Sequence, residues 1–367
     1  MSTLITIDLD ALEANYRFCS EQLQTVTCAA VVKADAYGLG MLKIAPVLMR
    51  AGCRHFFTAT HQEGAALRAM LPDAEIYILE GVTERSLAVF CDQGLVPVLI
   101  SPAHSSLWAE QARELGHPLP AIIDIDTGMT RLGFGERELR QLLEKPEDLE
   151  WLDVRYVMTH YACADDPGVI KNREQLERFD RLRSLLPSAP TCIGNSAGGL
   201  LGQAFSGDMA RLGIALFGGN PYQNGRLKPG SELKPVLRVQ SQILQLREIE
   251  EGTTIGYGAT YSAKNRMRIA TIGTGYADGY PWSLGNRGVA SIGGQRVPVV
   301  GRISMDSMML DVTALPDELL QTGLMVDLIG PGISLEEVAE LAGTINYEIL
   351  TRLSQRARRK YIGGTGN

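Results

Sequence analysis

The sequence predicts an α/β protein in which an N-terminal (β/α)8 TIM-like barrel is followed by a mainly antiparallel β domain. Short apolar runs alternate with helix-like segments over the first part of the chain, which is typical of parallel βα units. After a stretch rich in proline, glycine and lysine at 220–236, the pattern changes to long alternating runs. We therefore place the barrel at residues 1–230 and the β-rich domain at 231–367.

The expected barrel strands are short runs rich in valine, isoleucine and alanine. They cover residues 27–34, 55–60, 75–80, 96–101, 121–126, 154–160, 191–195 and 209–217. Between them lie segments with helical spacing of apolar residues, such as 39–52, which ends at Gly52, and 171–186. Eight βα units in roughly 230 residues agree with the usual size of this barrel.

The second domain is expected to consist mainly of antiparallel strands with one clear helix. Its expected strands cover residues 236–249, 267–280, 295–312 and 324–330. A helix is expected to begin after Ser334, because Ser334 and Glu337 match the pattern of a capping box. Gly343 follows the last residue with helical spacing, so the helix is expected to end there.

The composition argues against several classes of protein. A net charge of −7 argues against nucleic acid or an anionic membrane as a partner, since both favour a basic surface. The dense basic run at 356–360 is interpreted as the solvated last turn of a helix, where cations are stabilised. We expect a cytoplasmic protein, because there is neither a membrane-length apolar stretch nor a signal-type start. The 6 cysteines contain no CxxC pair and the 5 histidines no HExxH pattern, so no bound metal is expected.

Polar residues fall where several of the expected barrel strands end. They are Lys33, Arg131, His160, Asn195, Ser196 and Arg211. Taken singly, each is more often structural: a lone histidine is usually hydrogen-bonded in a core, and a lone arginine is usually a surface charge. In barrels of this kind, however, the chemistry takes place at the carboxyl ends of the strands. Their coincidence on one face therefore predicts a catalytic pocket.

Two glycine-rich segments lie at the usual phosphate position of such barrels, after the seventh and eighth strands. They read "GNSAGG" and "RLGIALFGG", and their backbone N–H groups can approach an anion. Such loops alone are weak evidence. Lys33, however, directly follows an apolar run, where an unpaired charge is unfavourable. A strand-end lysine with a phosphate site is what pyridoxal phosphate needs, since it requires an amine for its Schiff base and an anchor for its phosphate.

Segments along nearly the whole chain resemble, in order, the motifs of the alanine racemase family. They are "AVVKADAYGLG", "DIDTGMTRLGFG", "VMTHYACAD", "CIGNSAG", "RLGIALFG", "IGYGATY", "TGYADGY", "GRISMDSMMLDVT" and "NYEILTRLSQRARRKY". The resemblance implies a fold-type III barrel that binds pyridoxal 5'-phosphate, and a β-rich C-terminal domain. It also implies a head-to-tail homodimer with shared active sites, in which the C-terminal domain of one subunit covers the barrel mouth of the other.

The resemblance implies a two-base racemase. Racemisation removes a proton from one face of the α-carbon and delivers another to the opposite face, so one base on each side suffices. By the resemblance, these bases are Lys33 and Tyr257 of the partner subunit. His160 and Arg211 match a chain that leads from the tyrosine and favours its phenolate. Arg211 also faces the pyridine nitrogen, where a guanidinium, which keeps its protons, is expected to give a weaker electron sink and fewer side reactions.

The resemblance also nominates binding residues. The cofactor phosphate is expected to contact Tyr37, Ser196 and the backbone at Gly213 and Ile214. The substrate is a small amino acid, and its carboxylate is expected to bind the planar guanidinium of Arg131 and the backbone of the partner subunit's Met305. Tyr276 is expected to line the entrance, and Asp306 is expected to have a structural role.

Two positions depart from the pattern of the family. Many members carry a carbamylated lysine two positions before the aspartate of "DTGM", whereas this chain has Asp124. We expect this native carboxylate to orient Arg131 without any modification. Many members also have a tyrosine that reaches the cofactor phosphate where this chain has Gln355. That difference either loosens the pocket enough to admit serine beside alanine, or is compensated by a neighbour.

The leading hypothesis is an alanine racemase that supplies D-alanine for peptidoglycan. A racemase with broader or serine preference stays open because of Gln355 and Ser304. A decarboxylase of the same fold type fits less well, because "GRISMD" and "IGYGATY" follow the pattern of the racemases. A non-catalytic pyridoxal phosphate carrier typically lacks the second domain, and that hypothesis leaves Tyr257 unexplained.

Overall fold

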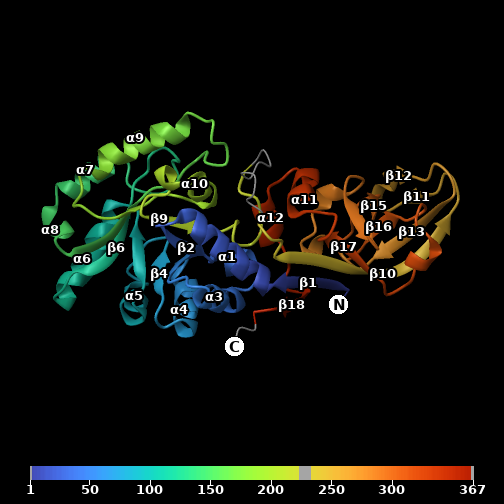
Figure 1. Ribbon diagram of the computed structural model, residues 1–367, viewed down its shortest axis with the longest axis horizontal. Helices are drawn as coiled ribbons and strands as arrows, with labels where there is room; N and C mark the ends of the chain where they lie inside the picture. Colours follow the sequence, from blue (N-terminus) through green and yellow to red (C-terminus); the bar gives the residue numbers. More distant parts are fainter. Residues whose placement is uncertain (1, 223–232, 365–367) are drawn as a thin grey trace.

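The computed structural model describes residues 2–222 and 233–364, which form two domains side by side (Figure 1). The first domain is a closed barrel of parallel strands. They are β2 (Thr27–Val31), β3 (His55–Thr58), β4 (Glu75–Ile78), β5 (Val96–Leu99), β6 (Leu119–Asp124), β7 (Leu152–Met158), β8 (Thr191–Cys192) and β9 (Met209–Leu212). Each of the eight predicted strands is confirmed, and β9 pairs with β2 to close the barrel.

Helices surround the barrel. They are α1 (Leu9–Leu23), α3 (Met41–Arg50), α4 (His61–Met70), α5 (Leu87–Gln93), α6 (Pro102–Leu115), α7 (Glu136–Leu143), α8 (Pro146–Leu149), α9 (Lys171–Arg183) and α10 (Ser196–Leu201). Each of the longer ones turns one apolar face to the strands; in α3, for example, Ile44 and Leu48 are fully buried. The helices expected at 39–52 and 171–186 are confirmed as α3 and α9.

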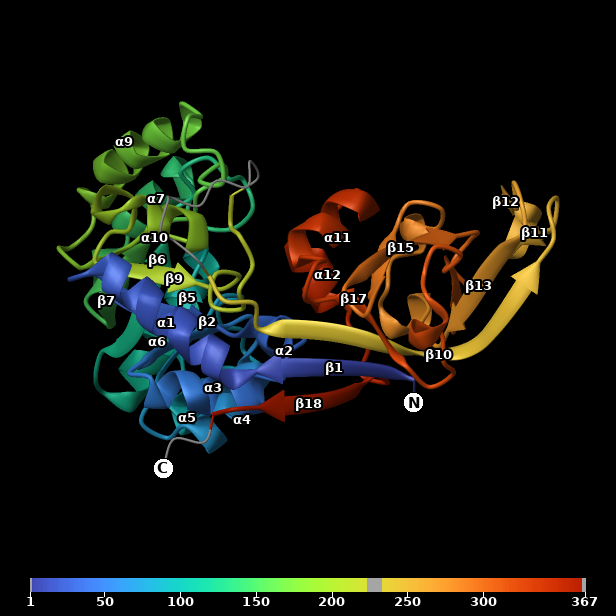
Figure 2. The ribbon, with the colours of Figure 1, turned by 45° about the vertical axis from the view of Figure 1, so that its right-hand side comes forward.

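The second domain is built on a mainly antiparallel sheet. Its strands, in spatial order, are β13 (Met267–Ile272), β16 (Met308–Asp311), β15 (Gln295–Val300), β14 (Val289–Ile292), β17 (Met325–Ile329), β10 (Leu237–Ile249), β1 (Thr3–Asp8) and β18 (Arg358–Ile362). A small ribbon of β11 (Thr254–Ile255) and β12 (Tyr261–Ser262) extends from it, and α11 (Leu335–Ala342) and α12 (Asn346–Thr351) lie on the side of the barrel (Figure 2).

The first strand of the chain belongs to the second sheet. β1 pairs antiparallel with β10 and parallel with β18, and the three run together between the domains (Figure 2). The predicted division at residue 230 groups β1 with the barrel, whereas in the structure β1 is a strand of the second domain's sheet. The burial pattern gives the physical reason, since alternate residues such as Ile5 and Ile7 are buried, as in a sheet with one covered face.

Two expected elements of the second domain differ in the structure. The basic run at 356–360, interpreted as a helix end, instead leads into β18, an edge strand in which Arg358 and Lys360 are exposed and Arg359 is half-buried. The strand expected over 267–280 ends at Ile272, because a 3-10 turn follows at Tyr276–Asp278 and Gly279 adopts a φ of 96°. The interpretation of residues 356–360 as the end of a helix was therefore wrong, and so was the predicted length of the strand over 267–280.

The expected helix start at Ser334 is confirmed, and half of its capping box forms. The Ser334 hydroxyl accepts a hydrogen bond from the backbone N–H of Glu337 at 3.1 Å. The carboxylate of Glu337 does not turn back to the cap, because it forms an ion pair with Arg296. Gly343 ends the helix with a φ of 73°, a conformation that glycine adopts without strain.

Both domains share one continuous hydrophobic core. Buried side chains of the barrel, of β1 and β10, and of α11 and α12 belong to the same cluster of contacting residues. Since burial of apolar surface is the main favourable contribution to folding, this shared core fixes the two domains relative to each other. In the described part of the chain, no helix has the length and apolar character needed to cross a membrane.

Candidate active site

A cavity of about 580 Å³ lies where the barrel strands end at their carboxyl termini. The residues predicted for the site that line it are Lys33, Tyr37, Arg131, His160, Ser196, Arg211 and Gly213. Asp124 and Asn195 line it as well, whereas Ile214 is fully buried outside the lining. The β strands thus bring residues far apart in the sequence to one mouth, as expected for a barrel of this kind.

Lys33 begins an unusual turn directly after β2. The next four residues, 34–37, all have positive φ values, from 52° for Ala36 to 57° for Tyr37. Each non-glycine residue in this left-handed region costs about 1–2 kcal/mol, so the surrounding structure must hold the turn. We call residues 33–38 the lysine turn. Its winding directs both Lys33 and Tyr37 to the cavity.

The surroundings of Lys33 favour its neutral amine. Burial lowers the pKa of Lys33, and the positive charges of Arg131 and Arg211 lower it further, while Glu63 and Glu80 act in the opposite direction. A neutral amine is both a nucleophile and a base, whereas an ammonium group is neither. Lys33 is therefore suited to covalent chemistry and to proton transfer.

Arg211 and His160 form a buried polar pair beside the lysine. Arg211 is only 4% exposed, and its guanidinium donates to the carbonyls of Cys192 at 2.8 Å and Thr159 at 2.9 Å. It also lies 3.0 Å from Nδ1 of His160. Because a guanidinium can only donate, Nδ1 must accept, and the neutral ring then carries its proton on Nε2. Burial, together with the charges of Arg211, Arg131 and Lys33, lowers the pKa of His160 and keeps it neutral.

Hydroxyl and backbone N–H groups gather where the chain leaves β8 and β9. The Ser196 hydroxyl accepts from the N–H of Gly213 at 2.9 Å, and the Asn195 side chain accepts from the N–H of Gly198 at 2.9 Å. A Cβ atom at Gly213 would overlap the Tyr37 hydroxyl, so glycine is required there. Burial raises the pKa of Tyr37, which keeps its hydroxyl protonated and able to donate to an anion.

Asp124 is a buried carboxyl group at the end of β6. It is 7% exposed, and burial raises its pKa to about 7, although Arg211 and Arg131 lower it. Within residues 2–222 and 233–364, no ion pair of 4.0 Å or less joins Asp124 to Arg131. The loop before Arg131 is instead shaped by Asp126, whose carboxylate accepts from the backbone N–H groups of residues 128–130 at 2.9 to 3.0 Å.

Helix α12 also contributes to the cavity, and this contribution was not predicted from the sequence. Tyr347, Glu348 and Thr351 line the cavity, and the ring of Tyr347 lies 6.1 Å from that of Tyr37. The signal was present in "NYEILT", but nothing in the sequence indicated that a helix of the second domain reaches the barrel mouth. Gln355, which was expected near the phosphate, is not part of the cavity lining.

Three predicted site residues lie on the second domain, away from this cavity. Tyr257, Met305 and Tyr276 are 72%, 52% and 41% exposed. None of them lines the cavity at the barrel mouth of the same chain. A single chain therefore brings together the residues predicted from the barrel, and leaves those of the second domain on its surface.

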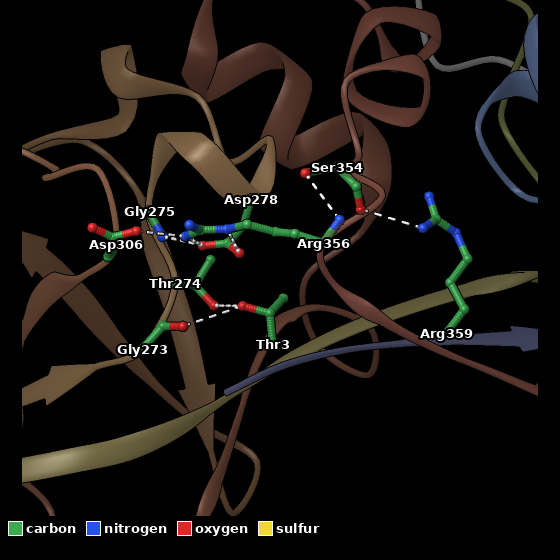
Figure 3. A network of polar contacts seen from close by, with 9 residues as sticks. All are labelled: Thr3, Gly273, Thr274, Gly275, Asp278, Asp306, Ser354, Arg356 and Arg359. Carbon is green, nitrogen blue, oxygen red and sulfur yellow. Dashed lines mark hydrogen bonds and ion pairs between the residues drawn. The ribbon is translucent and has the colours of Figure 1, made fainter. Parts of the chain in front are cut away.

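A polar network holds the loops that carry Tyr276 and Met305 (Figure 3). Arg356 donates to Asp278 at 2.9 and 3.0 Å and forms an ion pair with Asp306 at 2.8 Å. Backbone hydrogen bonds join the same loops, since the N–H of Tyr276 donates to Ser304 at 3.1 Å. Asp306 is thus one of the groups that fix the two loops together, in agreement with the structural role expected for it.

A closed barrel with a lysine of lowered pKa, and with hydroxyl and backbone N–H groups at the carboxyl ends of its strands, is typical of the class of barrel enzymes. Comparison with known proteins defines it further. A family model described as "Alanine racemase, N-terminal domain" matches residues 7–221, and "Alanine racemase, C-terminal domain" matches residues 236–361. The chain belongs to the alanine racemase family, whose members are amino-acid racemases.

Individual relatives agree over the whole length. An alanine racemase of Brucella suis is 43% identical, with 99% of this chain and 95% of the relative covered. A catabolic alanine racemase of Agrobacterium fabrum is 44% identical, with 98% and 92% covered. The crystal structure of alanine racemase from Bartonella henselae with covalently bound pyridoxal phosphate has a TM-score of 0.94 and 39% identity, and the match covers 99% of this chain and 100% of that one.

Proposed function

We propose that this protein is a pyridoxal phosphate-dependent racemase that interconverts L-alanine and D-alanine by a two-base mechanism. Lys33 is one base, and Tyr257 of the partner subunit is the other. The observation that carries the proposal is the position of Lys33, a lysine with a lowered pKa at the end of a barrel strand, in a cavity that also holds anion-binding donors. The names of the relatives and the cofactor in the Bartonella henselae structure support it.

The residues of the cavity fit pyridoxal phosphate. Lys33 would supply the amine for its aldehyde. Tyr37, Ser196 and the backbone at Gly213, all in the lining, would supply donors for its phosphate, together with the backbone at the adjoining Ile214. The overlap that any Cβ at Gly213 would create is consistent with a backbone that must be approached closely. When bound, the cofactor withdraws electrons from the substrate and so acidifies its α-proton.

Lys33 exchanges a proton with the α-carbon on one face, and a second group must act on the opposite face. His160 does not suit that role, because its Nδ1 accepts from Arg211 and its Nε2 carries a proton. That Nε2–H is instead suited to stabilise a phenolate. Tyr257 of the partner subunit then takes or gives the second proton as phenolate or phenol. One turnover leaves each base in the opposite protonation state, which is the state from which the reverse reaction starts.

A homodimer completes the site in this proposal. Tyr257 and Met305 are exposed in the single chain, together with Trp282 at 54%, so their side chains are accessible to a second subunit. The cavity at the barrel mouth would receive Tyr257 and Met305 from the second subunit. Arg131 and the backbone of the partner's Met305 bind the substrate carboxylate, and Tyr276 lines the entrance.

In the cell, the proposed role is to supply D-alanine for peptidoglycan in the cytoplasm. The name of the Agrobacterium fabrum relative shows that a closely similar enzyme is assigned to catabolism. Deletion of the gene separates the two roles: a biosynthetic enzyme leaves cells dependent on added D-alanine, whereas a catabolic one impairs only growth on alanine.

The decisive experiment incubates the purified protein with separate L-amino acids in deuterated water, followed by chiral separation and mass analysis. We expect D-alanine with deuterium at the α-carbon, and none with the Lys33→Ala variant. D-serine in comparable amounts would indicate a broader racemase. Cofactor binding without any α-proton exchange would overturn the proposal and indicate a pyridoxal phosphate carrier.

A further inference from the structure

Arg359 links the end of the chain to the lysine turn. Its Nη2 atom donates to the carbonyl of Gly38, the last residue of the turn, at 3.0 Å. The same guanidinium donates to the carbonyls of Leu353 and Ser354, each at 3.3 Å. Because its donors lie in one rigid plane, a guanidinium can join groups of two segments at once. Arg359 thus ties the turn to the residues that follow α12.

Tyr361 makes a second contact with the same region. Its hydroxyl donates to the carbonyl of Leu39 at 2.9 Å, and a Cβ atom at Gly40 would overlap that hydroxyl. On the other side, a Cβ atom at Gly38 would lie 2.8 Å from the carbonyl oxygen of Leu350. The end of the chain is therefore packed directly against the backbone that follows Tyr37.

Gln355 completes these contacts. Its Nε2 atom donates to Asp35 at 3.4 Å, and its Oε1 atom accepts from Arg359 at 3.1 Å. The other carboxylate oxygen of Asp35 accepts from the backbone N–H of Met41 at 2.8 Å. Asp35 therefore connects the middle of the lysine turn both to the start of α3 and to the end of the chain.

The same segment is anchored in the second domain. The carbonyl of Ser354 accepts from Arg359 (Figure 3). Ser354 also donates its own N–H to the carbonyl of Asp278 at 3.1 Å. Arg356, two residues later, holds Asp278 and Asp306. A continuous polar network therefore runs from the lysine turn in the barrel to the loops of the second domain.

We propose that Gln355, Arg359 and Tyr361, which we call the C-terminal brace, hold the lysine turn in its left-handed conformation and thereby position Lys33 in the cavity. Arg359 is the main positioning residue, since it bridges the two segments. The four successive positive φ values require such support from outside the turn. The catalytic consequence of the brace rests on the proposed role of Lys33, whereas its structural effect does not.

The first test measures hydrogen–deuterium exchange of the backbone amides at 33–41 in the full-length protein, with and without pyridoxal phosphate. We compare Arg359→Met with Arg358→Met, because the side chain of Arg358 is exposed on the same strand and makes no hydrogen bond or ion pair among the described residues. Arg359→Met is expected to exchange about tenfold faster over the turn, since losing the bridge favours local opening, and Arg358→Met is expected to match the unmodified protein. Equal exchange in the two variants would overturn the proposal.

Tyr361→Phe provides a milder variant, which removes one hydroxyl and keeps the packing of the ring. It is expected to raise exchange at 38–41 by a smaller factor in the same direction, and unchanged exchange at these amides in both Tyr361→Phe and Arg359→Met would exclude the brace.

Kinetics and cofactor trapping separate the brace from the proposed function. Arg359→Met is expected to lower kcat for alanine by about tenfold with little change in KM, because misplacing Lys33 affects proton transfer more than binding. Borohydride reduction followed by peptide mass analysis reports whether the cofactor is attached at Lys33. Faster exchange in Arg359→Met with no cofactor trapped in the unmodified protein would support the brace and contradict the proposed function. Normal trapping with unchanged exchange would do the reverse.

Discussion

Asp124 shows how strongly a single carboxyl group responds to its surroundings. Burial at the end of β6 raises its pKa to about 7, whereas an aspartate in an unfolded chain titrates near its ordinary value of about 4. Between these two pH values, the folded protein holds a proton that the unfolded chain has released. Asp124 therefore lowers the free energy of unfolding progressively as the pH rises from about 4 to about 7.

Asp124→Asn is expected to remove this effect. Above pH 7, its free energy of unfolding should exceed that of the unmodified protein by about 4 kcal/mol, because the pKa of Asp124 rises from about 4 to about 7, and the difference should vanish near pH 4. Denaturant unfolding of the cofactor-free protein from pH 4 to 8 measures both limits. Asp92→Asn, at an exposed position on α5, is the matched control and should show no such trend. A variant less stable than the parent at pH 8 would mean that Arg131 and Arg211 stabilise the ionised form more than burial destabilises it.

Arg211 is expected to limit side reactions, because its guanidinium keeps its protons and so does not protonate the ring nitrogen of the cofactor. In Arg211→Glu, the carboxylic acid can share its proton with the ring nitrogen. The ratio of transamination to racemisation is therefore expected to rise by about tenfold or more. Pyruvate formed per D-alanine produced measures this ratio, and Arg358→Glu controls for the change of charge. An unchanged ratio in Arg211→Glu would count against this role.

The cavity residues that come from the barrel were predicted better than those that come from the second domain. Lys33, His160 and Arg211 end or follow buried strands, and the parallel barrel places all such positions on one face. The contact from Arg211 to Nδ1 of His160 depends on backbone placement that no local pattern encodes. Tyr347 was missed because its position depends on how the second domain packs on the first.

The lysine turn is the element whose conformation the sequence did not reveal. Alanine, aspartate and tyrosine in "ADAY" would ordinarily continue a right-handed helix or a strand, and none of them requires a positive φ. The turn is bound by residues far away in the sequence, such as Arg359, which donates to the carbonyl of Gly38, and in our proposal these contacts hold its conformation. Tertiary structure therefore overrides local preference at the segment on which the proposed chemistry depends.

Ala34→Gly is expected to stabilise the protein by about 0.5–1 kcal/mol. Ala34 is exposed with a φ of 53°, so glycine relieves the left-handed strain without losing buried surface, although it gains freedom in the unfolded chain. Ala66→Gly on α4, where the exposed alanine is helical, should instead lose about 1 kcal/mol. Thermal unfolding of both variants measures whether Ala34→Gly raises and Ala66→Gly lowers the stability. Destabilisation by Ala34→Gly would contradict the claim that Ala34 is strained.

The barrel strands were predictable because burial on both faces makes each a short, continuous apolar run. The edge strands of the second sheet lack that signal. In β18, charged residues alternate between exposed and half-buried positions, which by composition alone suits the end of a helix equally well. β1 reads as a strand, yet its pattern carries no indication of which sheet it joins.

At the scale of the whole molecule, a shared site predicts complementation between two inactive variants. Lys33→Ala and Tyr257→Phe each damage both sites of a homodimer. In a mixed dimer, one site combines the intact Lys33 of one subunit with the intact Tyr257 of the other. Random reassortment should therefore restore about a quarter of the activity of the unmodified dimer, since half of the dimers are mixed and each has one sound site. Mixing without any recovery would place both bases in the same chain.

The pairing of β1 with β10 and β18 also has a consequence for synthesis of the chain. The first strand leaves the ribosome long before residues 237–241, with which it pairs in the sheet, exist. At ordinary rates of translation, this delay lasts about 10 to 50 seconds. During that time, a segment with β propensity waits unpaired, and the strand that closes the barrel, β9, is itself made only shortly before residues 237–241. The nascent chain therefore needs either weak self-association of "TLITID" or a chaperone that shields it.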